Sequence, residues 1–116
     1  MNKEQEAWKK TSAELQRAEK ARAAGNEGRA RVCARRAAGF AIDFYLIERL
    51  GMPHNQDALK LLQKFQDHPK MPDGLRAAAK RLTKRVTPDH RLPHPQDPLE
   101  DARAIIAGLL NSPATP

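Results

Sequence analysis

The fold is decided by one helix-length stretch, residues 35–50, which reads RRAAGFAIDFYLIERL. This stretch is apolar nearly all the way round, whereas the other helical stretches of the chain are apolar on one side. A helix that is apolar on every side is normally buried on every side. After two arginines, its first turns carry the small residues Ala37, Ala38 and Gly39, which let neighbouring helices come close. We therefore predict that it forms the buried centre of a small helical bundle.

Periodicity and helix-ending residues extend this prediction to the whole chain. The Gly25-Asn26 turn separates two long helices, and Gly51 followed by Pro53 ends the second one. A short turn between long helices predicts an antiparallel hairpin. The expected helices cover residues 3–23, 27–50, 56–66, 73–86 with Asp73 as the N-cap, and a last segment that opens after Pro98. The sequence thus predicts an all-α, up-and-down bundle of about five helices, with one domain at residues 1–110 and a disordered C-terminal tail at 111–116.

Composition and charge narrow the class of protein. A chain of 116 residues normally forms one domain, and its single cysteine, Cys33, cannot form an internal disulfide. No apolar run approaches the roughly 20 residues that span a bilayer, and the polar N-terminus lacks the apolar stretch of a signal peptide. We expect a cytoplasmic protein without a membrane partner. Its net charge of +7 permits an anionic partner.

The positive charge is concentrated in residues 76–91, where one acidic residue, Asp89, accompanies six basic ones. These are Arg76, Lys80, Arg81, Lys84, Arg85 and Arg91. Such a run is either a solvated helix face or a surface for phosphate or nucleic acid, and the sequence leaves both open.

Few residues are arranged for catalysis or metal binding. Cys33 lies on the apolar side of its helix, which favours a core role over a reactive thiol. The four histidines form no ligand set, so we expect no metal and no cofactor. Arg85 and His90 are separated by four residues, a spacing that could bring a cation and a proton carrier to one phosphodiester. The alternative is an exposed loop histidine beside a helix-ending arginine. Asp43, inside the apolar helix, needs either a cationic or hydrogen-bonding partner or a place at the rim.

Taken in order, these features resemble the HEPN domains (higher eukaryotes and prokaryotes nucleotide-binding). The similar segments are Trp8 in an Ala-rich first helix, the hairpin ARAAGN at 21–26, FYLIERLG at 44–51, DALKLL at 57–62, RLP at 91–93 and DPLEDAR at 97–103. The resemblance implies a five-helix bundle, often a homodimer, from prokaryotic toxin–antitoxin or defence systems and commonly paired with a nucleotidyltransferase. Active members are metal-independent RNases with an Arg-x4–6-His motif, which would carry over to Arg85 and His90. Val86 stands where that motif has a polar residue, and Leu92 where the related Arg-Tyr-Pro loop has tyrosine.

The leading hypothesis is a HEPN-like domain that binds a partner protein or the phosphate of a nucleotide or RNA. Its contact surface would consist of Arg76, Lys80, Arg81, Lys84 and Arg91. The first alternative is an RNase toxin acting through Arg85 and His90, and the second is a helical adaptor or dimerisation module without a ligand. Three arginines at the start of the central helix, Arg31, Arg35 and Arg36, are expected to face a groove or a dimer mate.

Overall fold

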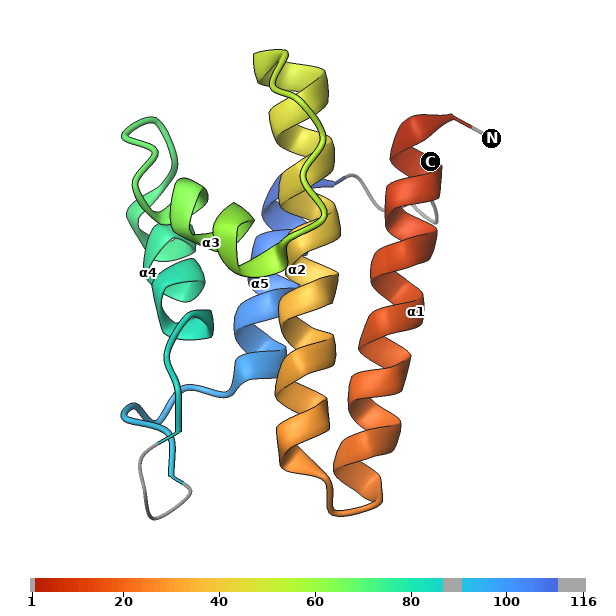
Figure 1. Ribbon diagram of the computed structural model, residues 1–116, viewed down its shortest axis with the longest axis vertical. Helices are drawn as coiled ribbons and strands as arrows, with labels where there is room; N and C mark the ends of the chain where they lie inside the picture. Colours follow the sequence, from red (N-terminus) through yellow and green to blue (C-terminus); the bar gives the residue numbers. More distant parts are fainter. Residues whose placement is uncertain (1, 87–90, 111–116) are drawn as a thin grey trace.

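Five α-helices make up the computed structural model, which describes residues 2–86 and 91–110 (Figure 1). They are α1 (Lys3–Ala23), α2 (Glu27–Leu50), α3 (Ala58–Gln66), α4 (Asp73–Leu82) and α5 (Pro98–Leu109). These residues contain no β-strand, and α1 and α2 pack against each other as a long hairpin. The predicted all-α bundle is confirmed. The tail prediction for residues 111–116 falls outside the part of the chain that is described.

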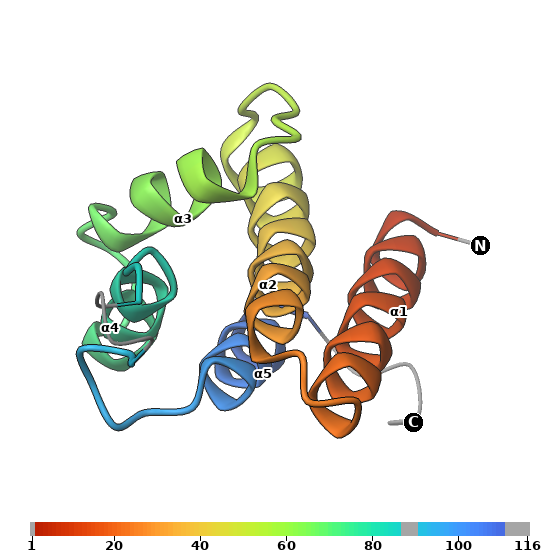
Figure 2. The same cartoon turned by 60° about the horizontal axis from the view of Figure 1, so that its bottom comes forward.

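Helix α2 is the centre of the bundle, as the apolar stretch predicts. It contacts α1, α3 and α5, while α4 packs against α3 and α5 (Figure 2). Ala34, Ala37 and Ala38 are completely buried, so the helices around α2 meet it on side chains of minimal size. A Cβ atom on Gly39 would lie 3.1 Å from the Cβ atom of Ala58, so the start of α3 fits closely against α2 there. From this crossing α3 runs away from α2 toward α4 (Figures 1 and 2).

The helix ends follow local capping chemistry, with three corrections to the sequence prediction. Asp57 accepts a hydrogen bond from the Lys60 amide, so α3 begins at Ala58 and not at residue 56. Asp73 was expected to be the N-cap of α4, but it is the first residue of that helix. Pro72 occupies the cap position, and its carbonyl accepts bonds from two amides of the first turn. Helix α4 ends at Leu82, with Thr83 as its C-cap, and does not extend to Val86 as expected.

An ion-pair network ties the beginning of α5 to the end of α1 and the start of α2. The Arg22 guanidinium, at the end of α1, donates two hydrogen bonds to Asp97 at 2.8 and 2.9 Å and also binds Glu27. Asp97 is at the same time the N-cap of α5, since it accepts from the Leu99 amide. The α1–α2 turn is therefore tied to the beginning of the last helix. None of the described helices is both long and apolar enough to cross a membrane.

The Arg22–Asp97 pair makes stability depend on pH. Hydrogen bonds from Arg22 lower the pKa of Asp97 below its ordinary value of 3.8. The folded state therefore binds this proton more weakly than the unfolded state. The stabilisation is fully present at neutral pH and is lost progressively as the pH falls below about 4 toward the lowered pKa of the folded state. Asp97→Asn keeps a capping side chain but removes the charge. We expect its free energy of unfolding at pH 7 to be about 1 kcal/mol lower than that of wild type, a small difference because both partners are partly exposed. Urea unfolding at several pH values measures this difference, and a gap that stays constant down to pH 3 contradicts the assignment.

Candidate functional site

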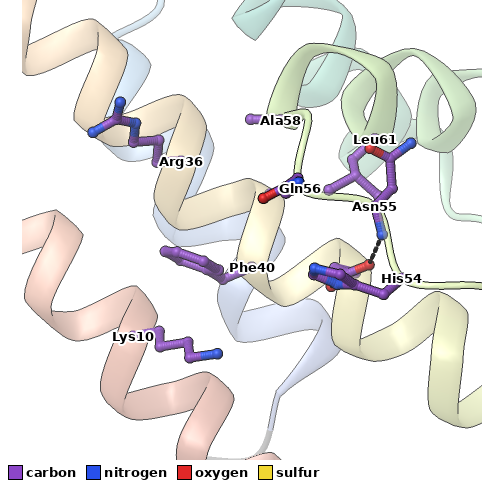
Figure 3. Close-up of a pocket in the computed structure, with 10 residues that line it drawn as sticks. Lys10, Arg36, Phe40, His54, Asn55, Gln56, Ala58 and Leu61 are labelled. Carbon is purple, nitrogen blue, oxygen red and sulfur yellow. Dashed lines mark hydrogen bonds and ion pairs between the residues drawn. The ribbon is translucent and has the colours of Figure 1, made fainter.

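A polar hollow lies between α1, α2 and the loop that leads into α3; we call it the Phe40 pocket (Figure 3). Its volume is about 320 Å³, and it is partly open to solvent. Gly39, Phe40 and Leu61 supply apolar wall, while polar side chains stand around the mouth. The polar residues are Lys10 from α1, Arg36 from α2, and His54, Asn55 and Gln56 from the loop. The lining thus comes from three segments of the chain: α1, α2 and the continuous stretch of residues 54–61.

Asp43 fixes the loop side of this pocket. Its side chain is buried, with 12% exposed, and its Oδ2 atom lies 2.5 Å from Nδ1 of His54. The Oδ1 atom accepts a hydrogen bond from the Asn55 amide at 3.0 Å. Because a carboxylate can only accept, the proton of this contact belongs to Nδ1, and Nε2 of His54 is left for other partners. The buried carboxylate that the sequence singled out is satisfied, by a histidine eleven residues downstream and a backbone amide.

Lys10 and Arg36 bring positive charge to the same pocket. The Lys10 Nζ atom lies 5.7 Å from the centre of the Phe40 ring, within the range of a cation–π contact. Arg36 lies one turn before Phe40 on α2, and Figure 3 shows the ring between Lys10 on one side and Arg36 and Gln56 on the other. Among the described residues, no acid forms an ion pair with either cation.

A second group of cations forms where α2 passes the end of α4; we call Arg31, Arg35, Lys84 and Arg85 the Arg35 cluster. Arg35 donates to the carbonyl oxygens of Leu82 at 2.7 Å and Lys84 at 2.8 Å. Carbonyls at a helix C-terminus lack partners within the helix and carry partial negative charge, so a guanidinium stabilises them. Burial, with added repulsion from Arg31 and Arg85, lowers the pKa of Arg35. The cap therefore brings Arg35 close to Arg31 and Arg85, and Lys84 supplies one of the capped carbonyls.

The expected contact surface on α4 is divided by its hydrogen bonds. Arg76 turns back to α3, where its Nε atom donates to the Gln66 carbonyl at 2.9 Å. Arg81 faces α5 and binds Asp101 through two hydrogen bonds of 2.8 and 3.0 Å. Lys80 is exposed beside a shallow hollow that also holds Asp67 and Asp73. Arg91 is exposed in the segment that precedes α5. Of the six basic residues in the run 76–91, only Lys84 and Arg85 lie in the Arg35 cluster, and of the five expected to form the contact surface only Lys84 does.

Of the proposed RNase pair, the structure describes Arg85 but not His90. Arg85 is exposed beyond the end of α4, and His90 lies outside the described residues, so their convergence stays a prediction. Cys33 is buried on α2, and burial together with nearby Glu14 raises the pKa of its thiol. A raised thiol pKa disfavours the reactive thiolate, in keeping with the predicted core role. Within residues 2–86 and 91–110, no three His, Cys, Asp or Glu side chains are close enough to share a metal ion.

Sequence reasoning missed most of the Phe40 pocket. Lys10, His54, Asn55 and Gln56 come from different segments, and none belongs to a charge run or a motif. Two signals were available: Asp43, whose position in an apolar helix required a partner, and Arg36, which was expected to face a groove or a dimer mate and lines this pocket.

Comparison of the chain with family models, with curated proteins and with solved structures finds no match. The class of protein is therefore the one that fold and geometry define: an all-α domain whose described residues form five helices, the Phe40 pocket and a separate cluster of cations.

Proposed function

We propose that this helical domain binds the phosphate groups of RNA or of a nucleotide through the Arg35 cluster. The observation that carries the proposal is the pairing pattern of the cations. Arg31, Lys84 and Arg85 form no ion pair with any described acid, and Arg35 binds two carbonyls and no carboxylate. A set of like charges without counter-charge attracts a polyanion.

Other arginines of the protein show the contrasting arrangement. Arg17, Arg22, Arg81 and Arg103 each bind at least one carboxylate. The positive charge of these arginines is balanced by the carboxylates, so they contribute little to the attraction of an anionic ligand. The Arg35 cluster is therefore a better candidate for phosphate contact than the whole basic run of α4. It keeps Lys84 and Arg85 from that run and adds two arginines of α2.

The cluster is also held in place by the fold. Arg35 is half-buried and fixed by its two carbonyl bonds, so its charge cannot move far from Arg31 and Arg85 when they repel it. A bound phosphate would relieve this repulsion. Because phosphate neutralisation releases counterions, the resulting affinity should depend strongly on salt.

The test is RNA binding by a variant that lacks three cluster charges but retains the capping Arg35. We expect Arg31→Gln/Lys84→Gln/Arg85→Gln to bind a labelled single-stranded RNA at least about tenfold more weakly than wild type at low salt. Its plot of log affinity against log salt should be shallower by about 2, since each lost phosphate contact removes about 0.7 from the slope on a single strand. Fluorescence anisotropy at several salt concentrations gives both values.

A control with the same net charge separates a site from general attraction. Lys60→Gln/Lys64→Gln/Lys70→Gln removes three exposed lysines on α3 and the loop after it. This variant should keep most of the affinity and the slope. Equal losses in the two triple variants, or unchanged binding in both, would refute the cluster as the site, and no RNA binding by wild type would leave the ligand-free adaptor as the better hypothesis. Circular dichroism checks that each variant is folded.

The remaining expectations from the HEPN resemblance stay predictions: a homodimer, a nucleotidyltransferase partner and RNase activity of Arg85 with His90. The same RNA can be incubated with the protein in EDTA and examined on a denaturing gel. Cleavage that His90→Ala abolishes would support the RNase alternative.

A further inference from the structure

We infer that the Phe40 pocket is a second binding site, for a small aromatic carboxylate. This proposal goes beyond phosphate binding at the Arg35 cluster, and the two share no residue. It rests on three features of the pocket: an aromatic wall, one surplus positive charge, and polar groups held in place at the mouth.

The apolar wall suits a flat ring. The Phe40 side chain is partly exposed at the shared border of three hollows along α1 and α2. Gly39 has no side chain, and Ala58 and Leu61 complete the wall toward α3. Aromatic rings stack on one another in an offset or edge-on manner with added stabilisation. A volume of about 320 Å³ is at the small end for ligand pockets, which favours one or two rings over a long ligand.

The charge balance indicates a single negative charge. Lys10 and Arg36 face the pocket, and Asp43 is its one carboxylate, with both oxygens already engaged by His54 and Asn55. One positive charge is thus left over, which matches a carboxylate better than a doubly charged phosphate. The adjoining hollow, toward the N-terminus of α1, has a surplus of negative charge. Its lining contains two lysines and three acidic residues: Lys3, Lys10, Asp43, Glu6 and Glu48. The carboxylate is therefore expected on the Arg36 side of Phe40.

The mouth of the pocket is arranged before any ligand arrives. The two bonds to Asp43 hold the His54 ring and the Asn55 backbone, and Gln56 follows directly in the chain. The side-chain amide of Gln56 can donate a hydrogen bond to a carboxylate, whereas the side chain of Asn55 is engaged by the Asp57 amide, which donates to its Oδ1 atom. Groups that are fixed in advance lose little entropy on binding, which favours affinity even for a small ligand.

Binding of 2-naphthoate, measured by isothermal titration calorimetry, tests this inference, with neutral 2-naphthamide and inorganic phosphate as matched probes. We expect 2-naphthoate to bind at least about tenfold more tightly than the amide, and phosphate to compete only weakly. Lys10→Gln/Arg36→Gln should reduce the affinity for 2-naphthoate to that of the amide. Phe40→Leu, which keeps an apolar side chain without the ring, should weaken both aromatic probes.

Two further variants make the result specific. Arg49→Gln removes an exposed charge at the end of α2, away from the pocket lining, and should leave binding unchanged. The triple variant of the Arg35 cluster should also bind 2-naphthoate like wild type. Loss of RNA binding in that variant then tests the phosphate site alone, and loss of 2-naphthoate binding in Lys10→Gln/Arg36→Gln tests the Phe40 pocket alone. No binding of 2-naphthoate, equal affinity for naphthoate and naphthamide, or full binding by Lys10→Gln/Arg36→Gln would overturn the inference. The double variant changes exposed side chains, so its result does not depend on a repacked core.

Discussion

Replacing Arg81 by methionine is expected to lower the free energy of unfolding by about 3 kcal/mol. The Asp101 side chain is almost completely buried, with 7% exposed, and Arg81 satisfies both of its oxygens. Methionine retains much of the apolar stem of the arginine but leaves the carboxylate buried without its cation. An isolated buried charge costs far more than the pair contributed, because desolvation is no longer offset. Urea unfolding at pH 7 measures the loss.

The matched control for Arg81 is removal of both charges. Arg81→Met/Asp101→Leu replaces the pair with apolar side chains of similar size, and most of the lost stability should return. A double variant that is as unstable as Arg81→Met would show that packing and not the unpaired carboxylate causes the loss. Arg103→Met on α5 provides a second comparison. The Arg103 side chain is partly exposed and pairs with the exposed Glu19 and Glu100, so its replacement should cost about 1 kcal/mol or less.

Replacing Arg35 by methionine is expected to cost about 2 kcal/mol. The variant removes two charge-assisted hydrogen bonds to carbonyls at the end of α4 and leaves those carbonyls near the negative end of the helix dipole. Part of the cost is offset, because repulsion between Arg35 and its neighbours Arg31 and Arg85 disappears as well. Hydrogen exchange should show faster opening at the C-terminal end of α4.

Arg31→Met serves as the control for Arg35. Arg31 belongs to the same cluster but donates no hydrogen bond to a described residue, so its replacement should leave stability within about 0.5 kcal/mol of wild type. If the two single variants are equally stable, the capping role of Arg35 is wrong. The comparison also separates the structural part of the cluster from the part proposed to bind phosphate.

Local signals were sufficient to predict most of the fold from the sequence. The ends of α1 and α2 are set by residues within one turn: Asn2 and Asn26 as caps, the Gly25-Asn26 turn, and Gly51 with a positive φ of 64°. The beginning of α3 was misplaced by two residues because Asp57 takes the cap position. At Asp73 a good capping residue follows a proline, and the proline carbonyl fulfils part of the cap function instead.

The candidate sites could be predicted far less well, because they depend on contacts between distant segments. Arg76 and Arg81 are close to Lys84 in sequence, yet each is turned toward an acceptor on another element, Gln66 or Asp101. Arg35 reaches the end of α4 across 47 residues of chain. Helical periodicity gives the face on which a side chain lies, but it does not give the helix that covers that face.

The order of the helices along the chain has a consequence for folding kinetics. The most extensive helix–helix interface, between α1 and α2, lies within the first fifty residues and is closed by the short link from Ala24 to Asn26. Closing so short a loop costs little chain entropy, and local contacts of this kind favour rapid folding. The hairpin can therefore form during synthesis, before α5 has left the ribosome. Helix α5 then completes the burial of α2, so the last part of the chain finishes the core that the first part begins.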